Sequence, residues 1–173
     1  LPLLLASAWA EEPVEEGAVA VEGAAVEGGE IPAEAVPVEF VPTYSATLKQ
    51  LGTNYTMHLR GIEGSDSVSF DVRADQVVSK ARVKLEYSYS PALLPDLSQI
   101  NLMVNDQVAA SLPVPKETAG TLQQQVLDIP PHLITEFNRL TLQLIGHYTM
   151  MCEDPLHSSL WAKVSNTSEL QLE

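Results

Sequence analysis

The chain has 173 residues, with 9 Lys and Arg against 23 Asp and Glu, one Cys, 12 Pro and 9 Gly, a length that accommodates one ordinary domain with a tail. The net charge of −14 argues against a nucleic-acid partner, because such a surface needs Lys and Arg to displace counterions from phosphate. A single Cys excludes an internal disulfide framework and a Cys-based structural zinc site within this sequence.

The first ten residues predict the end of a cleavable signal peptide. Four of the first five residues are Leu, and Ala8-Trp9-Ala10 places small residues at positions −3 and −1 of a cleavage site. A truncated buried helix or strand is the alternative, but the acidic stretch that follows provides nothing to bury these leucines. We therefore expect a mature chain that begins near Glu11, outside the cytoplasm. Because no uninterrupted apolar run reaches about 18 residues, the sequence predicts no transmembrane helix.

Residues 11–42 predict a disordered acidic linker rich in Ala, Val, Glu and Pro. This segment holds nine Glu and no Lys or Arg, so only five net negative charges remain for residues 43–173. Pro and Gly interrupt every helical pattern, and aromatic residues are almost absent. Such a segment cannot bury enough apolar surface to offset the entropy lost on ordering. An acidic tail that binds a partner is the alternative.

From about residue 43 the pattern predicts strands. Apolar and polar residues alternate, so each strand has one buried and one solvated face, at 67–73, 82–89, 100–104, 108–112, 140–144 and 169–172. Asn105-Asp106 predicts a tight hairpin turn, and His132–Phe137 could form one helical turn. Tyr87 and Tyr89 are expected to be paired across a sheet or buried. Seven to nine short strands predict an all-β fold for residues 43–173, an antiparallel β-sandwich of jelly-roll type.

The densest cluster of polar residues, 147–161, lies between two predicted strands. A metal site formed by His147, Cys152, Asp154 and His157 would have suitable ligand types, but the spacing fits no compact zinc pattern. Cys152 and His157 as nucleophile and base are near in sequence, which is not evidence that they meet in space. We therefore expect no metal and no catalytic residue in this segment.

The two adjacent carboxylates of this segment are also a poor catalytic pair. Glu153 and Asp154 would diverge in an extended chain, whereas the carboxyl groups of a glycosidase face each other across the scissile bond. The structural alternative is a tight loop in which Asp154 with Ser158 or Ser159 satisfies backbone groups and Cys152 is buried.

Trp161 has two interpretations. A Trp on a strand more often belongs to a core than to a binding surface. However, this Trp is near Tyr148, His157 and two carboxylates in sequence. Sugar rings present apolar C–H faces to an aromatic plane and hydroxyl groups to polar side chains at its edge, so the segment also suits carbohydrate binding.

Several segments together carry a family resemblance. They are residues 48–52, 59–61, 67–75, 87–98, 113–116, 137–140, 144–148 and 152–162. The last, Cys152-Glu-Asp-Pro-Leu-His-Ser-Ser-Leu-Trp-Ala162, is the most specific, because eleven residues of mixed chemistry rarely recur by chance. Over about residues 47–173 the chain resembles the periplasmic B subunit of bacterial cellulose synthase, a family traditionally labelled a cyclic di-GMP-binding regulatory subunit.

The resemblance implies an N-terminal fragment of a longer chain, in which 43–173 is the first jelly-roll carbohydrate-binding-type domain and a membrane anchor follows beyond residue 173. It implies a noncatalytic subunit, periplasmic and attached to the inner membrane. This subunit supports the membrane glycosyltransferase that uses UDP-glucose, and guides the nascent β-1,4-glucan. The implied partners are the catalytic subunit of cellulose synthase, the glucan chain and neighbouring copies of itself.

No cofactor is expected for this domain, and cyclic di-GMP enters through the family label only. The sequence has no Arg-rich phosphate-binding motif, and an exported domain would not meet a cytoplasmic nucleotide. Within the matched loop we expect a carbohydrate- or partner-binding face formed by Trp161, His157, Asp154, Glu153 and Tyr148. Two alternatives remain open, a subunit-assembly module with no direct glucan contact and an exported glycan hydrolase.

Overall fold

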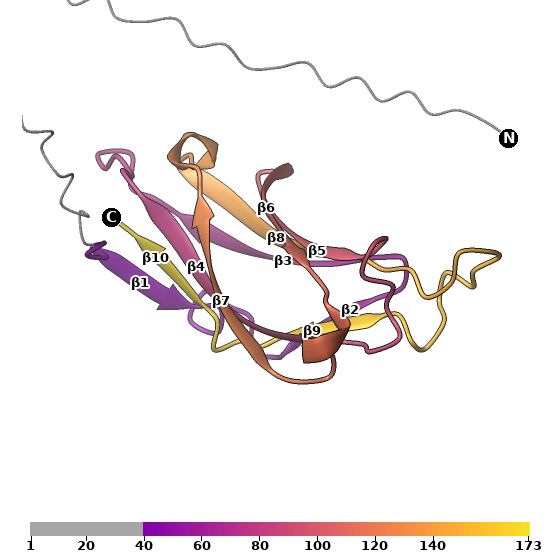
Figure 1. Ribbon diagram of the computed structural model, residues 1–173. Helices are drawn as coiled ribbons and strands as arrows, with labels where there is room; N and C mark the ends of the chain where they lie inside the picture. The colour runs from indigo at the N-terminus through magenta and orange to yellow at the C-terminus, as the bar shows by residue number, and fades with distance from the viewer. Residues whose placement is uncertain (1–39) are drawn as a thin grey trace, which may run out of the picture. The chain divides into compact units, whose positions relative to one another are not determined.

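Strands with alternating burial build residues 40–173, the part of the chain that the computed structural model describes (Figure 1). In β4 (Ala81–Tyr89), five apolar side chains are buried and the residues between them are partly exposed. β3 (Glu63–Asp71) and β8 (Phe137–Ile145) follow the same rule, as the sequence pattern predicts. The predicted signal peptide, 1–10, and residues 11–39 of the predicted linker lie outside the described residues.

The first sheet has the strand order β1-β10-β4-β9-β2, and β7 pairs with β4. Its other strands are β1 (Tyr44–Thr47), β2 (Met57–Arg60), β7 (Gln123–Ile129), β9 (Trp161–Val164) and β10 (Glu169–Leu172). β10 pairs with the first half of β4 and β9 with its second half, so β9 and β10 form one interrupted strand. β1 pairs with β10 and β2 pairs with β9, so each half of this side of the sheet ends in its own outer strand.

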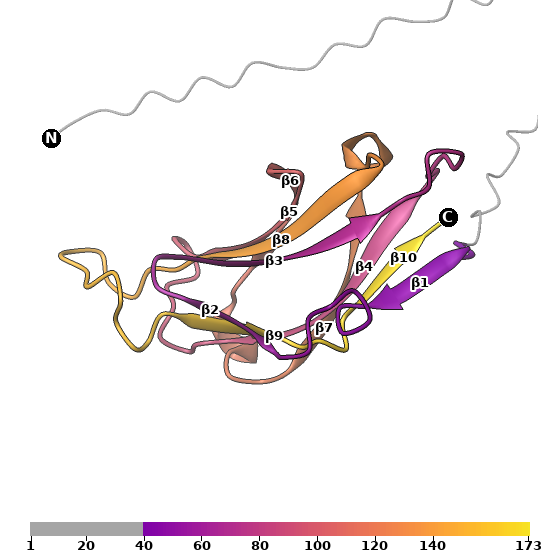
Figure 2. The ribbon, with the colours of Figure 1, turned by 180° about the vertical axis from the view of Figure 1, so that it is seen from behind.

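The second sheet has the order β3-β8-β5-β6, with β5 (Gln99–Val104) and β6 (Gln107–Pro113) joined by a two-residue turn. Both turn residues adopt the left-handed conformation, with φ of 51° at Asn105 and 64° at Asp106. Asn and Asp tolerate that conformation, which suits the tight turns of hairpins. The predicted hairpin and the predicted antiparallel β-sandwich of jelly-roll type are therefore confirmed (Figure 2).

Within residues 40–173, the helical segments are two short 3₁₀ turns, η1 (Lys116–Thr118) and η2 (Pro131–Leu133). The helical turn expected over His132–Phe137 is therefore wrong in its extent. Pro131 at the first helical position starts the turn earlier. The side chain of Asn138 accepts a hydrogen bond from the backbone N–H of Thr135 at 2.7 Å, and Phe137 already begins β8.

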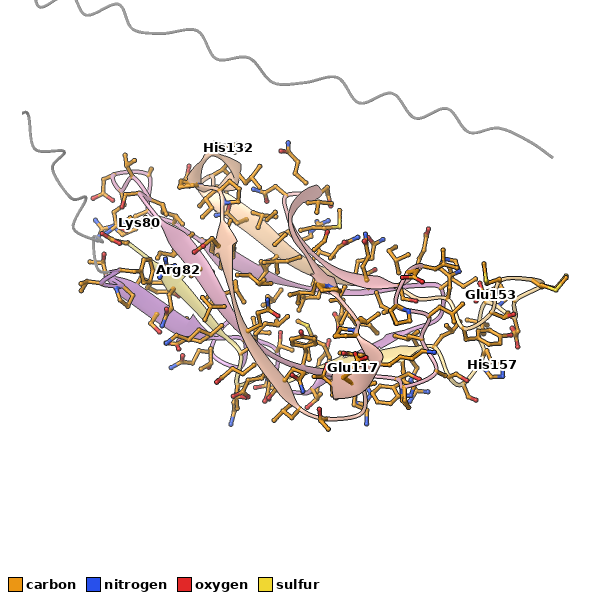
Figure 3. The ribbon with its side chains drawn as sticks, in the orientation of Figure 1. Lys80, Arg82, Glu117, His132, Glu153 and His157 are labelled. Carbon is orange, nitrogen blue, oxygen red and sulfur yellow. The ribbon has the colours of Figure 1, made fainter. Side chains whose placement is uncertain are left out.

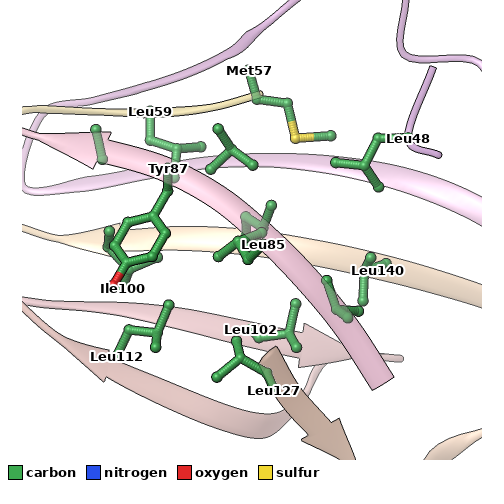
Figure 4. Packing of buried hydrophobic residues seen from close by; sticks show 14 of the residues in the cluster. Leu48, Met57, Leu59, Leu85, Tyr87, Ile100, Leu102, Leu112, Leu127 and Leu140 are labelled. Atoms are coloured by element: carbon green, nitrogen blue, oxygen red, sulfur yellow. The ribbon is translucent and has the colours of Figure 1, made fainter. Parts of the chain in front are cut away.

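A continuous apolar core lies between the two sheets (Figure 4). Leu85 of the first sheet and Leu102 and Leu140 of the second are among its fully buried members. Tyr87 and Tyr89 are buried, one of the two arrangements expected for them, and the Tyr89 hydroxyl donates to the Pro115 carbonyl at 2.6 Å. Within residues 40–173, no helix is long and apolar enough to cross a membrane.

Candidate functional site

A long loop, residues 146–160, connects β8 to β9 and projects from the end of the sandwich opposite Glu173 (Figures 1 and 3). Neighbouring segments hold its base. The backbone N–H of Leu94 donates to the His147 carbonyl at 2.7 Å, and that of Ile62 donates to the Pro155 carbonyl at 3.2 Å. Gly61, at the corner between β2 and β3, has a φ of 88°, and a Cβ there would lie 3.0 Å from the same Pro155 carbonyl oxygen. The corner therefore needs glycine both for its conformation and for the close approach of the loop.

Glu153 organises the interior of this loop. Its carboxylate accepts hydrogen bonds from the Tyr148 backbone N–H at 2.6 Å and the Thr149 backbone N–H at 3.2 Å, and it lies 2.7 Å from His147 Nδ1. Only 11% of the Glu153 side chain is exposed. The hydrogen bond with His147 is the largest cause that lowers the pKa of Glu153. The two backbone bonds also lower it and burial opposes them. Glu153 therefore acts as a structural acceptor, and the structure does not bring it to the open face expected from the sequence.

Tyr148, Asp154 and His157 form the outer part of the loop. The Tyr148 hydroxyl accepts the backbone N–H of Asp154 at 3.0 Å, and Asp154 Oδ1 accepts that of Leu156 at 3.1 Å. The bond from Leu156 confirms that the Asp154 side chain satisfies a backbone group in a tight turn. His157 Nδ1 accepts from the Ser159 backbone N–H at 3.2 Å, so the ring proton of the neutral imidazole is on Nε2. Both Asp154 and His157 remain accessible to solvent.

Trp161 begins β9 and lies on the outer face of the first sheet. Its strand neighbours Ala162 and Val164 are buried, so Trp161 and Lys163 point away from the core. The Trp161 side chain is half-buried and lines a groove of about 390 Å³. The Lys163 ammonium lies 5.4 Å from the centroid of its ring, a cation–π contact. The interpretation of Trp161 as part of a surface is therefore the one that the structure supports.

The groove beside Trp161 is cationic. Arg60 is the cross-strand partner of Trp161 and His58 that of Lys163. His157 and Ser158 complete the polar lining. Among residues 40–173, neither Arg60 nor Lys163 has a carboxylate within ion-pair distance. Three other cations of the same sheet, at or just before the start of β4, do form ion pairs: Lys80, Arg82 and Lys84. Sequence reasoning missed these groove residues. The alternation of apolar and polar residues in Met57-His-Leu-Arg60 could have predicted the strand β2. It could not have predicted that β2 pairs with β9, which brings Arg60 to Trp161.

The sequence-predicted residues thus divide into two groups. Trp161 and His157 line the groove, Asp154 is exposed but is not part of the lining, and Tyr148 and Glu153 brace the loop. Cys152, expected to be buried in the structural alternative, is exposed, because the loop tip projects beyond the core. In the described part of the chain, no three His, Cys, Asp or Glu side chains are placed to hold a metal ion.

Comparison with known proteins gives a family match over most of the chain. The family described as "Cellulose synthase BcsB, first CBM domain" matches residues 41–173. A protein of Pseudomonas fluorescens named "Cyclic di-GMP-binding protein" is 71% identical over 130 residues, which cover 75% of this chain and 17% of that protein. A protein of the same name from Xanthomonas axonopodis is 52% identical, over 75% of this chain and 16% of the relative.

A third relative, "Cellulose synthase 1" of Komagataeibacter xylinus, is 30% identical over 129 residues, 75% of this chain and 8% of that protein. The chain therefore spans less than a fifth of the length of these curated relatives.

Proposed function

Because the chain belongs to the cellulose synthase BcsB family and contains its first CBM domain, we propose that it is a noncatalytic regulatory module of a cellulose synthase complex. In this proposal the domain lies in the periplasm, in a longer protein attached to the inner membrane. It supports the glycosyltransferase that polymerises glucose from UDP-glucose, and it guides the nascent β-1,4-glucan. The catalytic subunit and the glucan are its partners. The relative named "Cellulose synthase 1" supports the link to cellulose synthesis.

The single observation that carries glucan contact is the open groove beside Trp161. An indole ring at a solvent-accessible edge offers a flat apolar surface to a sugar, and His157 and Ser158 line the same groove as hydrogen-bonding groups. Lys163 already contacts this ring, so a sugar must share or displace that cation. Such competition keeps binding weak, as guidance of a moving polymer requires.

Titration of the chain with cellohexaose tests this proposal. We expect a Kd in the high micromolar range or weaker, and a loss of binding of about tenfold in Trp161→Ala, comparable with other lost aromatic contacts. Val126→Ala, an exposed apolar side chain on β7 of the same sheet, is the matched control and should bind like the unsubstituted chain. Sub-micromolar affinity would contradict a guiding role.

A second candidate, subunit assembly, is favoured by the apolar tip of the 146–160 loop. Met150, Met151 and Leu156 are 85%, 84% and 84% exposed. Met and aromatic side chains are enriched at protein interfaces. Trp161→Ala also separates the two functions. Loss of complex assembly with unchanged sugar binding would favour assembly, and loss of sugar binding in an intact complex would favour glucan contact.

The hydrolase alternative receives no support from the carboxylates. Glu153 is turned into the loop with three hydrogen-bond partners, and Asp154 satisfies the Leu156 backbone. A glycosidase needs two carboxyl groups that face each other across the scissile bond. Incubation with soluble cellodextrins should therefore release no shorter products.

A further inference from the structure

The outer face of the second sheet carries hydroxyl and amide side chains instead of charges across its middle. One row runs in register across all four strands. Its members are Ser65 of β3, Gln143 of β8, Asn101 of β5 and Ser111 of β6. The adjacent row contains Ser67 and Thr141 together with two apolar residues, Met103 and Val108. Charged residues of this face stand only beyond these rows, at Glu63 on one side and at Arg139 and Asp71 on the other.

Asn101 is the centre of a hydrogen-bonded network within this row. Its Oδ1 accepts from Ser111 Oγ at 2.7 Å and from Gln99 Nε2 at 3.0 Å, and its Nδ2 donates to Gln143 Oε1 at 3.5 Å. Asn101 is only 6% exposed, although it lies on the outward side of β5. Its neighbours cover it, and its bonds fix their orientation. The network therefore fixes the groups that it leaves free to face solvent. These are the N–H donors of the Gln143 amide and the acceptor lone pairs of Gln99 and Ser111.

The β6 strand is adjusted at this position. The register between β5 and β6 shifts between Leu102 and Met103, where Ala109 is an extra residue on β6. Without this bulge, the side-chain alternation of β6 would place Ser111 and Val108 on opposite faces of the sheet. Bulges are common where a strand must re-aim a side chain near a binding site.

The outer face of the first sheet has a different chemistry. Arg82 pairs with Asp128 at 2.6 Å and Lys84 with Glu169 at 3.6 Å, beside the unpaired cations of the Trp161 groove. In a chain with a net charge of −14, an uncharged central face four strands wide is therefore a specific property of the second sheet.

We propose that this face is a second glycan-binding site, which takes a neutral β-linked glucan laid across strands β3, β8, β5 and β6. Neighbouring strands are about 4.8 Å apart, comparable with the length of one hexose unit, so successive rings can meet successive polar side chains. Amide and hydroxyl groups match the donors and acceptors of sugar hydroxyls without the desolvation of a charge. This inference rests on the proposed function for the identity of the ligand and adds a site remote from Trp161.

Affinity electrophoresis of the chain in gels that contain hydroxyethyl cellulose tests the site. Thr141→Lys places a long charged side chain at the centre of the two rows, and Gln143→Ala removes one amide while Asn101 stays in place. We expect the apparent Kd to rise about tenfold in Thr141→Lys and about threefold or more in Gln143→Ala, as for one or two lost net hydrogen bonds. Gln124→Lys is the matched control, because it adds the same side chain on the opposite sheet, facing Glu86.

The outcomes separate the two proposals. Unchanged retardation of Thr141→Lys and Gln143→Ala, with melting temperatures like that of the unsubstituted chain, would overturn the second site. Loss of retardation in Trp161→Ala would then leave the proposed function standing. Reduced retardation in both second-sheet variants but not in Gln124→Lys would support the site. Absence of retardation in the unsubstituted chain would overturn glucan binding as a whole.

Discussion

The phenol ring of Tyr148 stacks on the imidazole of His157, with ring centroids 4.4 Å apart and ring planes inclined by 16°. These residues stand at opposite ends of the projecting loop, so the stack closes the loop upon itself. With the carboxylate of Glu153 inside, the loop is an internally braced unit, anchored at its base and by the packing of Tyr148 against the core, and its apolar tip projects beyond. Its stability can therefore be changed separately from that of the sandwich.

Glu153→Gln should loosen this loop while the sandwich stays folded. The amide is a weaker acceptor than the carboxylate, and it presents a donor where the carboxylate had a second acceptor. We expect several-fold faster hydrogen exchange of the Tyr148 and Thr149 amides, measured by NMR. Asp154→Asn is the matched control, because its side-chain oxygen can still accept the Leu156 N–H. Equal exchange in the two variants would contradict the bracing role of Glu153.

Acid should loosen the same loop. Because the hydrogen bond with His147 lowers the pKa of Glu153 in the folded loop, the charged form is favoured there over the unfolded chain. The resulting stabilisation is fully present above the ordinary Glu pKa of about 4.5 and is lost as pH falls through the lower folded pKa. The protection factor of the Tyr148 amide, its exchange rate relative to the intrinsic rate at each pH, should fall over that acidic range in the unsubstituted chain. In Glu153→Gln this pH-dependent step should be absent.

A second acid-sensitive contact lies at the other end of the sheet. A hydrogen bond from Ser45 is the largest cause that lowers the pKa of Glu169, and contacts with Gln171 and Lys84 add to it. Acid therefore also weakens the β1–β10 contact. Amide exchange within β10, followed over the same pH range, separates this effect from that of the loop.

Gly64→Ala should destabilise the whole domain. A Cβ at this position would overlap the backbone nitrogen and oxygen of Arg60, and the backbone cannot yield without moving the corner that positions β2 beside β9. We expect a loss of about 3 kcal/mol or more in the free energy of unfolding, measured in urea. At Gly120 the φ of 76° is left-handed, but nothing lies near a Cβ. Gly120→Ala should therefore lower the free energy of unfolding by only about 1–2 kcal/mol, the cost of that conformation for a residue with a side chain. Comparable losses at both glycines would argue against the overlap.

Cyclic di-GMP should not bind residues 40–173. We propose that the domain needs no cofactor, although its relatives carry that nucleotide in their names. Calorimetric titration is therefore expected to give a Kd weaker than about 1 mM. The cationic groove gives this test a location. Tighter binding that disappears in Arg60→Gln with Lys163→Gln would contradict the proposal and place the nucleotide beside Trp161.

The sequence predicted the strands whose polar and apolar residues alternate over many positions, such as β4 and β8, since burial on one face requires that pattern. β7 was not predicted, because its three consecutive Gln conceal the inward positions of Leu127 and Ile129. At the candidate site, Trp161 and His157 could be found from their local cluster. Arg60 could not, since it reaches Trp161 only through the pairing of strands about 100 residues apart.

The inward orientation of Glu153 was also beyond the sequence pattern. A carboxylate next to Asp154 and a proline looks like part of an exposed polar loop. Only the turn at Tyr148 and Thr149 aims two backbone N–H groups at it. Hydrogen-bond geometry of this kind depends on the path of the whole loop, which alternation does not encode.

The pairing of β1 with β10 has a consequence for biosynthesis. Tyr44 lies opposite Leu172, so the earliest strand is held in its sheet by the latest one. A chain that emerges from its N-terminus onward, from the ribosome or across a membrane, cannot complete that sheet until residues 169–172 have followed. Folding must therefore wait for nearly the entire domain, and contacts between such remote segments form slowly.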